Sequence, residues 1–146
     1  MIKRKSIPKK VREAVYNKYN GHCAYCGNEL AYKDMQLDHL IPIRNWGNKY
    51  TEAQIECFEN YMPACRRCNH YKRAHTLKTF RKMIEEIPQK LFRDNYIYKV
   101  GLDYGLVNPN AHKVIFYFEQ VEQAREVYLN SDSECYNRAK EVWYSK

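Results

Sequence analysis

The chain has 146 residues, which is long enough for one ordinary domain with a modest core, so we expect a single domain over 1–146. Its 25 Lys and Arg against 17 Asp and Glu leave a net charge of +8 and favour a polyanionic partner such as nucleic acid. No apolar run approaches the length of a membrane span, and residues 1–10 do not resemble a signal peptide, so we expect a cytoplasmic protein without membrane association.

The first expected element is a helix over residues 8–20. Ser6 can cap its start, Pro8 suits its first turn and Gly21 suits its end. Apolar residues recur within this segment at helical spacing, and Val15 belongs to that stripe. We therefore expect one face of this helix to pack against the core.

A strand and a short helix are expected next. Residues 35–43 are rich in apolar and β-branched side chains, which predicts a strand. Residues 51–58 can form a short helix that Thr51 caps, with Ile55 and Phe58 facing inward.

The remainder of the chain is expected to be mostly helical. We expect helices over 65–75, 77–87 and 89–104, a strand over 114–118, and two short helices within 119–143. The strand assignment rests on the β-prone run VIFYF. Residues 76–146 are thus expected to form a mainly helical extension that packs on or beside a core of residues 6–75.

Six cysteines include two C-x-x-C pairs. The pairs are Cys23 with Cys26 and Cys65 with Cys68. Four thiolates suit a tetrahedral zinc ion, which would close a loop of about 40 residues and leave no open position for substrate, so its role would be structural. A redox dithiol or two disulfides are the alternatives. Gly27 permits the tight first turn, and Cys57 and Cys135 are interpreted as ordinary small buried hydrophobes.

An Asp-His pair lies between the two cysteine pairs. Asp38 offers an oxygen ligand to a hard divalent cation, and His39 can accept a proton from water near neutral pH. Because consecutive strand residues point to opposite faces, their cooperation requires a bend. Asn69 can supply a second oxygen ligand, and Lys72 and Arg73 follow on the same helical face, where they could contact a phosphodiester.

These residues together resemble the HNH endonucleases. The matching order is Cys23-x-x-Cys26, Asp38-His39-Leu40-Ile41-Pro42, Asn60 and Cys65-x-x-Cys68-Asn69-x-x-Lys72. The resemblance implies that His39 is the general base and that Asp38 binds the catalytic metal. It also implies that Asn60 is the central N, which fixes the loop between two strands. Asn69 occupies the final position of the motif, and His70 is an alternative metal ligand.

The resemblance implies an α+β fold in which a ββα-metal nuclease core, clipped by a four-cysteine zinc site, lies within a mostly helical small domain. It further implies hydrolysis of DNA by means of Mg²⁺ or Mn²⁺, as nicks or, from a homodimer, as double-strand breaks. RNA stays open as a substrate. The rival functions are a non-catalytic zinc-containing module that binds nucleic acid, and a structural or interaction protein.

Overall fold

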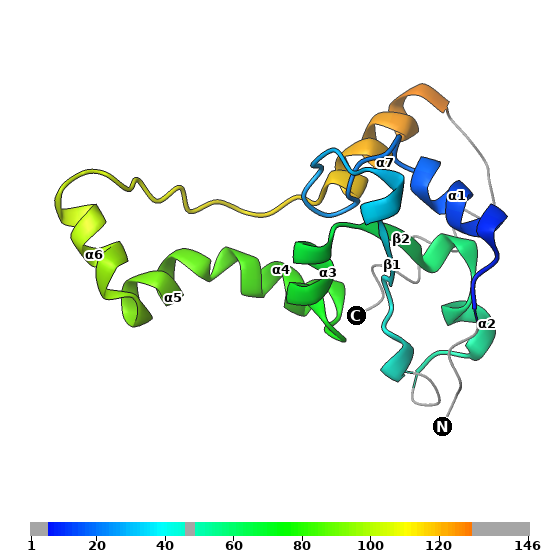
Figure 1. The fold of residues 1–146 in the computed structure, drawn as a ribbon, viewed down its shortest axis with the longest axis horizontal. Helices are drawn as coiled ribbons and strands as arrows, with labels where there is room; N and C mark the ends of the chain where they lie inside the picture. Colours follow the sequence, from blue (N-terminus) through cyan, green and yellow to red (C-terminus); the bar gives the residue numbers. More distant parts are fainter. Residues whose placement is uncertain (1–5, 46–48, 130–146) are drawn as a thin grey trace. The chain divides into compact units, whose positions relative to one another are not determined.

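The computed structural model describes residues 6–45 and 49–129 and divides the chain into two compact units (Figure 1). Unit 1 comprises residues 1–76 and 116–146, and unit 2 comprises residues 77–115. The helices and strands of unit 1 are α1 (Lys9–Asn17), β1 (Gln36–His39), α2 (Glu52–Ile55), β2 (Tyr61–Ala64), α3 (Arg66–Lys72) and α7 (Tyr117–Leu129). Those of unit 2 are α4 (Leu77–Glu85), α5 (Ile87–Asp94) and α6 (Tyr96–Asp103).

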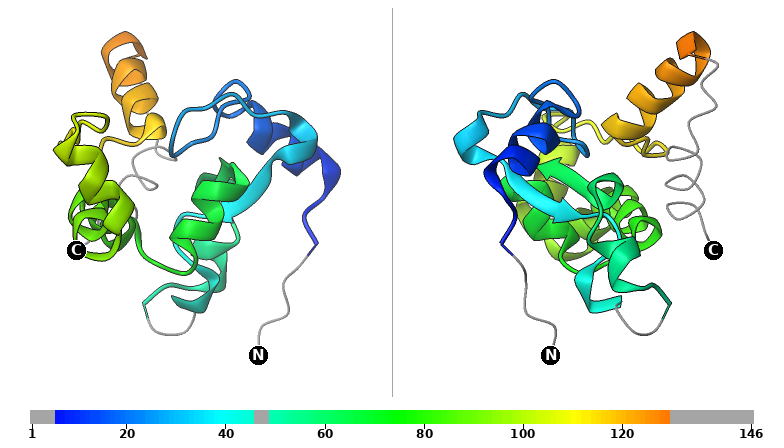
Figure 2. Two further views of the ribbon diagram at one scale, coloured as in Figure 1. Left: turned by 60° about the vertical axis from the view of Figure 1, so that its left-hand side comes forward. Right: turned by 90° about the vertical axis from the view of Figure 1, so that its right-hand side faces the viewer.

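Unit 1 is built around an antiparallel pair of strands. β1 and β2 pair over four positions, from Gln36 opposite Ala64 to His39 opposite Tyr61. α3 follows β2 directly and packs against β1 (Figure 2). Together these elements form a ββα arrangement, and the expected α+β class is confirmed.

Helix α1 forms as expected but begins differently. Its N-cap is Pro8, which makes no side-chain cap, so the expected capping role of Ser6 is wrong. Val15 is fully buried in a cluster with Met35 and Tyr61, as the apolar stripe predicted. Just after the helix, the Lys18 ammonium group donates hydrogen bonds to three backbone carbonyls between residues 58 and 61, which ties α1 to the start of β2.

Strand β1 is shorter than the expected strand over 35–43. The Leu40 amide still donates to the Asn60 carbonyl at 2.9 Å, but the Asn60 amide donates to the Cys57 carbonyl at 3.0 Å, so the ladder is not continued beyond His39. The Asn60 carboxamide oxygen accepts from the Ile41 amide at 2.8 Å, and its nitrogen donates to the Ile41 carbonyl at 3.1 Å. Asn60 is itself buried, so these bonds are shielded from water.

The short helix α2 has the expected N-terminal cap. Thr51 and Gln54 form a reciprocal capping box, in which each side chain bonds the backbone of the other. Ile55 is fully buried, as predicted. Phe58 is 40% exposed, so the expectation that it faces inward is wrong. The centroid of its ring lies 4.9 Å from the Lys18 ammonium nitrogen.

The run VIFYF does not form a strand. Helix α7 begins at Tyr117, in the middle of this run, and residues 114–116 are extended without a ladder. The aromatic residues are nevertheless buried, because Phe116 and Phe118 pack around the Tyr25 ring. The Glu119 side chain accepts a hydrogen bond from the Phe116 amide at 2.8 Å, which favours the start of a helix over further extension.

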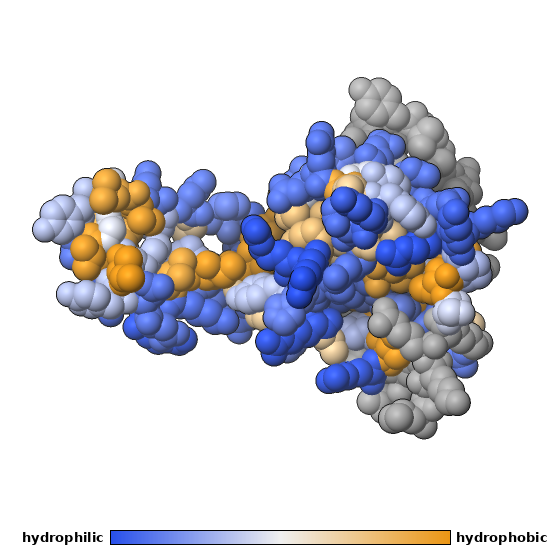
Figure 3. Space-filling view, viewed as in Figure 1, coloured by the Kyte–Doolittle hydropathy of each residue, from blue (hydrophilic) through white to orange (hydrophobic). Residues whose placement is uncertain are grey.

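Unit 2 is a run of three helices followed by an extended segment. Pro88 lies in the first turn of α5, so it begins a helix rather than ending one. The Glu85 carboxylate accepts a hydrogen bond from the Val114 amide at 3.0 Å and thereby holds the returning chain to α4. Apolar side chains are exposed on α5, α6 and the following turn (Figure 3): Phe92, Ile97, Val100 and Leu106. Among the described residues, no helix is long and apolar enough to cross a membrane.

Candidate metal centre and candidate active site

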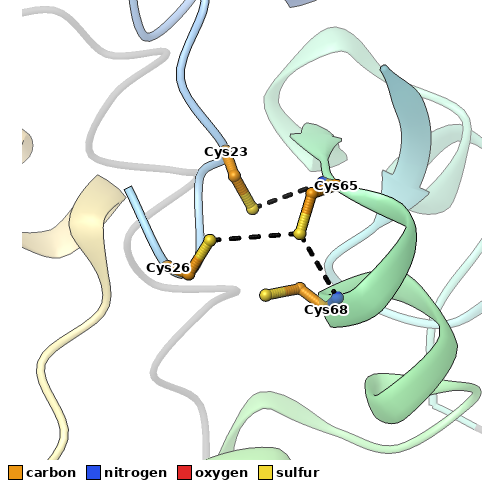
Figure 4. A group of neighbouring side chains, drawn as sticks. All are labelled: Cys23, Cys26, Cys65 and Cys68. Carbon is orange, nitrogen blue, oxygen red and sulfur yellow. Dashed lines mark hydrogen bonds between the residues drawn. The ribbon is translucent and has the colours of Figure 1, made fainter. Parts of the chain in front are cut away.

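The two C-x-x-C pairs converge on one point (Figure 4). The four sulfur atoms of Cys23, Cys26, Cys65 and Cys68 all lie within 4.8 Å of one another. The Cys26 and Cys65 sulfurs are 3.9 Å apart. A zinc ion with four Zn–S bonds of about 2.3 Å would place its sulfurs about 3.8 Å apart. The four cysteines are therefore placed to bind a metal ion, and their spacing suits zinc.

The first cysteine pair is shaped by a tight turn. Gly27 has a φ of +77°, a conformation that L side chains rarely adopt, and a Cβ at this position would lie 2.9 Å from the Tyr117 ring. The turn is closed by the Gly27 amide, which donates to the Cys23 carbonyl at 3.0 Å. The expected role of Gly27 is therefore supported by its conformation.

The first pair is also held from outside. The amides of Tyr117 and Phe118, at the N-terminus of α7, donate to the carbonyls of Tyr25 and Ala24 at 3.1 and 2.8 Å. The β-prone run predicts a strand for these aromatic residues. In the structure, their backbone amides instead hold the first cysteine turn, which is distant in sequence.

The thiols of the cluster influence one another. The hydrogen bond from Cys68 is the main cause that lowers the pKa of the Cys23 thiol to about 5. Burial raises the pKa of the Cys26 thiol to about 11. The thiolate form is thus favoured at Cys23 and the thiol form at Cys26. A bound cation would be needed to hold all four side chains as thiolates. Outside the cluster, Cys57 is half-buried, and its thiol donates a hydrogen bond to the Gln54 carbonyl. Cys135 lies outside the described residues.

Asp38 is held by two buried partners. The Tyr25 hydroxyl donates a hydrogen bond to the Asp38 Oδ2 atom, and the Lys72 ammonium group lies 3.1 Å from the same oxygen. Burial and the Asp38 charge raise the pKa of Tyr25, so its phenol stays protonated and donates. With Oδ2 engaged in this way, the second carboxylate oxygen is the one suited to a cation.

Lys72 differs from the expectation. Its side chain is 0% exposed, and its ammonium group also donates to the His39 carbonyl at 3.0 Å. The expectation that Lys72 faces a nucleic acid is therefore corrected, because the group is an internal counter-ion for Asp38. The next residue, Arg73, is exposed, so its side chain is accessible for the phosphodiester contact that was expected of it.

His39 is held on the other side of β1. Its Nε2 atom lies 2.9 Å from the Oε1 atom of Glu56, and its ring meets that of Tyr61 edge-on at 5.2 Å between centroids. The Tyr61 hydroxyl donates to the Oε2 atom of Glu56 at 2.8 Å, and burial followed by this bond raises the pKa of Tyr61. Glu56 was not identified from the sequence. The HNH motif does not include it, and nothing in its neighbourhood distinguishes it from a surface carboxylate.

Asp38, His39 and Asn69 line one pocket of about 690 Å³. The Asn69 amide nitrogen donates to the Gln36 Oε1 atom at 2.7 Å, which leaves the carboxamide oxygen to serve as an acceptor or ligand. Asp38 and His39 have different partners, yet both line this pocket. The chain bends at Leu40 and Ile41, directly after β1.

Three cationic or titratable side chains complete the wall of this pocket: Arg44, Arg73 and His75. Arg44 and His75 were not singled out in the sequence, since they lie outside the HNH motif. His70, the alternative ligand, is exposed and lines a second pocket beside Cys26 and Cys68. The structure thus brings Asn69, and not His70, to the pocket of Asp38.

Comparison with known proteins agrees with this geometry. A family model described as "HNH endonuclease" matches residues 23–85. Residues 23–85 are therefore similar to an HNH endonuclease domain. The resemblance that the motifs predicted is thereby confirmed over this segment, which contains the cysteine cluster and the pocket residues Asp38, His39 and Asn69.

The chain is also similar to part of much larger proteins. The CRISPR-associated endonuclease Cas9 of Corynebacterium diphtheriae (strain ATCC 700971 / NCTC 13129 / Biotype gravis) is 34% identical over 53 residues, which are 36% of this chain and 4% of that protein. The crystal structure of the Type II-C Cas9 enzyme from Actinomyces naeslundii aligns with a TM-score of 0.43 and 24% identity, covering 56% of this chain and 8% of that chain. The chain therefore spans only a small part of the length of these relatives.

Proposed function

We propose that this chain is a metal-dependent endonuclease that hydrolyses DNA phosphodiester bonds. The observation that carries the proposal is the pocket that Asp38, His39 and Asn69 line together, within a segment that matches the HNH endonucleases. Exposed Arg44 and Arg73 on the same wall suit the binding of a phosphate backbone. With one such pocket, a single chain would nick one strand, and a homodimer or two successive nicks would break both.

The residues of the pocket fit a hard divalent cation such as Mg²⁺ or Mn²⁺. Asp38 and Asn69 would hold it through a carboxylate and a carboxamide oxygen, which are the ligand types such ions prefer. When bound there, the cation would neutralise charge that develops on the phosphate and on the departing oxygen. The hydrogen bond from Tyr25 and the ion pair with Lys72 orient the Asp38 carboxylate. The positive charge of Lys72 offsets the negative charge of Asp38 when no cation is bound.

His39 would act as the general base. His39 lines the pocket, and its imidazole would accept a proton from a water molecule that attacks the phosphorus atom in line with the departing 3′ oxygen. The products would carry 5′-phosphate and 3′-hydroxyl ends. Asn60 would act at a distance from the substrate, because its buried bonds to Ile41 fix the loop that follows His39.

The four-cysteine cluster would hold a structural zinc ion. All four sulfurs point at one centre, which leaves no open position for substrate. The cluster joins the first turn to the start of α3, the helix that carries Asn69. The zinc would therefore position one side of the pocket without taking part in hydrolysis.

The test is a nicking assay on supercoiled plasmid with Mg²⁺ or Mn²⁺. We expect His39→Ala to reduce the rate by about 10²–10⁴-fold, the usual cost of losing a general base. Its zinc content and its circular dichroism spectrum should match the wild type. Cleavage by His39→Ala at the wild-type rate would exclude this role. Salt-dependent DNA binding without any metal-dependent cleavage would instead support a non-catalytic nucleic-acid-binding module.

A further inference from the structure

A carboxylate outside the HNH motif contacts the His39 ring directly. Glu56 is the C-cap residue of α2, and its Oε1 atom lies 2.9 Å from the His39 Nε2 atom. The two side chains are only 12% and 5% exposed. A pair this well shielded from water holds a more defined geometry than an ion pair on the surface.

The second oxygen of Glu56 is also fixed. The Tyr61 hydroxyl donates to Oε2 at 2.8 Å, and Tyr61 is the residue that faces His39 across the two strands. The Tyr61 ring packs edge-on against the imidazole. Both carboxylate oxygens of Glu56 are therefore engaged, one by the His39 ring and the other by the Tyr61 hydroxyl, so the position of the carboxylate is fixed.

This geometry selects one form of the imidazole. A neutral histidine carries one N–H donor and one acceptor nitrogen, and a carboxylate beside Nε2 stabilises the form with the proton on Nε2. In that form Nδ1 is the acceptor. Since His39 lines the pocket, the orientation that Glu56 imposes on its ring would determine which nitrogen takes a proton there. Glu56 is not among the described residues that line the pocket, so the contact that the structure gives it with this site is the one with the His39 ring.

We propose that Glu56 is a positioning residue for His39, which keeps the imidazole in the Nε2–H tautomer and presents Nδ1 as the base. The inference rests on the proposed role of His39 as general base. It goes beyond that role because it assigns a function to Glu56, a residue of segment 51–58 that lies outside the Asp38-His39 motif. Tyr61 supports Glu56 from behind.

The test uses three variants of the full chain. Glu56→Ala removes the acceptor, Glu56→Gln keeps an acceptor oxygen but removes the charge, and Tyr61→Phe removes the hydroxyl that holds Glu56. Glu52→Gln is the matched control, because it changes an exposed carboxylate on the same short helix. Each variant is assayed for single-turnover plasmid nicking and for DNA binding.

The tautomer is read separately by long-range ¹H–¹⁵N correlation spectra. The chain has only five histidines, and His39→Ala assigns the His39 signals. We expect the Nε2–H pattern in the wild type, in Glu56→Gln and in the control. Glu56→Ala should show a mixture of tautomers and cleave about 10–100-fold more slowly, the usual cost of losing the partner of a functional histidine, with unchanged DNA binding. Tyr61→Phe should show a smaller loss of the same kind.

Two results would overturn the proposal. One is a wild-type tautomer pattern and rate in Glu56→Ala, and the other is a loss in Glu56→Gln as large as in Glu56→Ala although the tautomer is retained. If Glu56→Ala does not fold, Tyr61→Phe and Glu56→Gln still decide the question. If the wild-type chain does not cleave at all, the proposed function fails, whereas the spectra still report whether Glu56 sets the His39 tautomer.

Discussion

The cysteine cluster and the Asp38–His39 pocket lie in the same unit but are built in different ways. The cluster takes its ligand atoms from one tight turn and from the N-terminus of α3, and these atoms already converge within 4.8 Å. The pocket is open, and each of its candidate functional side chains has a polar partner elsewhere in the chain. Asp38 depends on Lys72, His39 on Glu56 and Asn69 on Gln36.

The difference shows how the two kinds of site tolerate change. A closed sulfur cluster supplies stability, so its loss should affect the whole unit. An open pocket supplies chemistry, so the loss of one group should leave the fold intact, unless that group is also a buried counter-ion. Four variants test this comparison, and they are given in order of decreasing expected effect.

The largest effect is expected from Cys65→Ser. Removal of one sulfur should release the zinc and abolish cooperative unfolding of unit 1, because the link between the first turn and α3 is lost. The measurements are zinc content by mass spectrometry and thermal unfolding by circular dichroism. Cys57→Ser is the control, since that half-buried cysteine lies outside the cluster. A zinc-free Cys65→Ser variant with native unfolding behaviour would contradict a structural role for the cluster.

An intermediate effect is expected from Lys72→Met. The substitution leaves the buried Asp38 carboxylate without its cation, and breaking a buried ion pair typically costs about 3–5 kcal/mol of the free energy of unfolding. Urea unfolding measures the change. Arg73→Met is the matched control, because Arg73 is the exposed neighbour of Lys72, and its stability should match the wild type.

The double variant Asp38→Asn with Lys72→Met sharpens the same prediction. With the carboxylate replaced by an amide, no buried charge is left uncompensated, so much of the lost stability should return. If Lys72→Met is as stable as Arg73→Met, or if the double variant is no more stable than Lys72→Met, Lys72 does not act as an internal counter-ion.

The smallest effect is expected from Arg73→Gln. The loss of one phosphate contact should weaken DNA binding modestly and reduce the slope of log K against log salt concentration by about 1. Fluorescence anisotropy over a series of salt concentrations measures this slope. Arg93→Gln is the control, because Arg93 is exposed but is paired with Asp94. Equal slopes for both variants and the wild type would remove Arg73 from the binding surface.

The candidate site was predictable where its residues are close in sequence or share a motif. The spacing of the cysteines predicted the cluster, and the order of Asp38, His39 and Asn69 predicted residues that the structure brings to one pocket. The end of β1 at His39 was not predictable, because it depends on the distant Asn60 amide, which donates to the Cys57 carbonyl and not to β1. Residues 114–118 were likewise misassigned, since their partner is the cysteine turn and not a strand.

The sequence was sufficient to predict the four-cysteine cluster and the resemblance to the HNH endonucleases, because thiol spacing and the order of the motif residues are local features. The burial of Lys72 beside Asp38 and the contact of Glu56 with His39 appear only in the folded chain. From a sequence, a charged side chain is expected to be exposed to solvent. Whether it is buried depends on which distant groups offset the cost of desolvation. The partners that hold His39 and Asp38 are therefore properties of the fold.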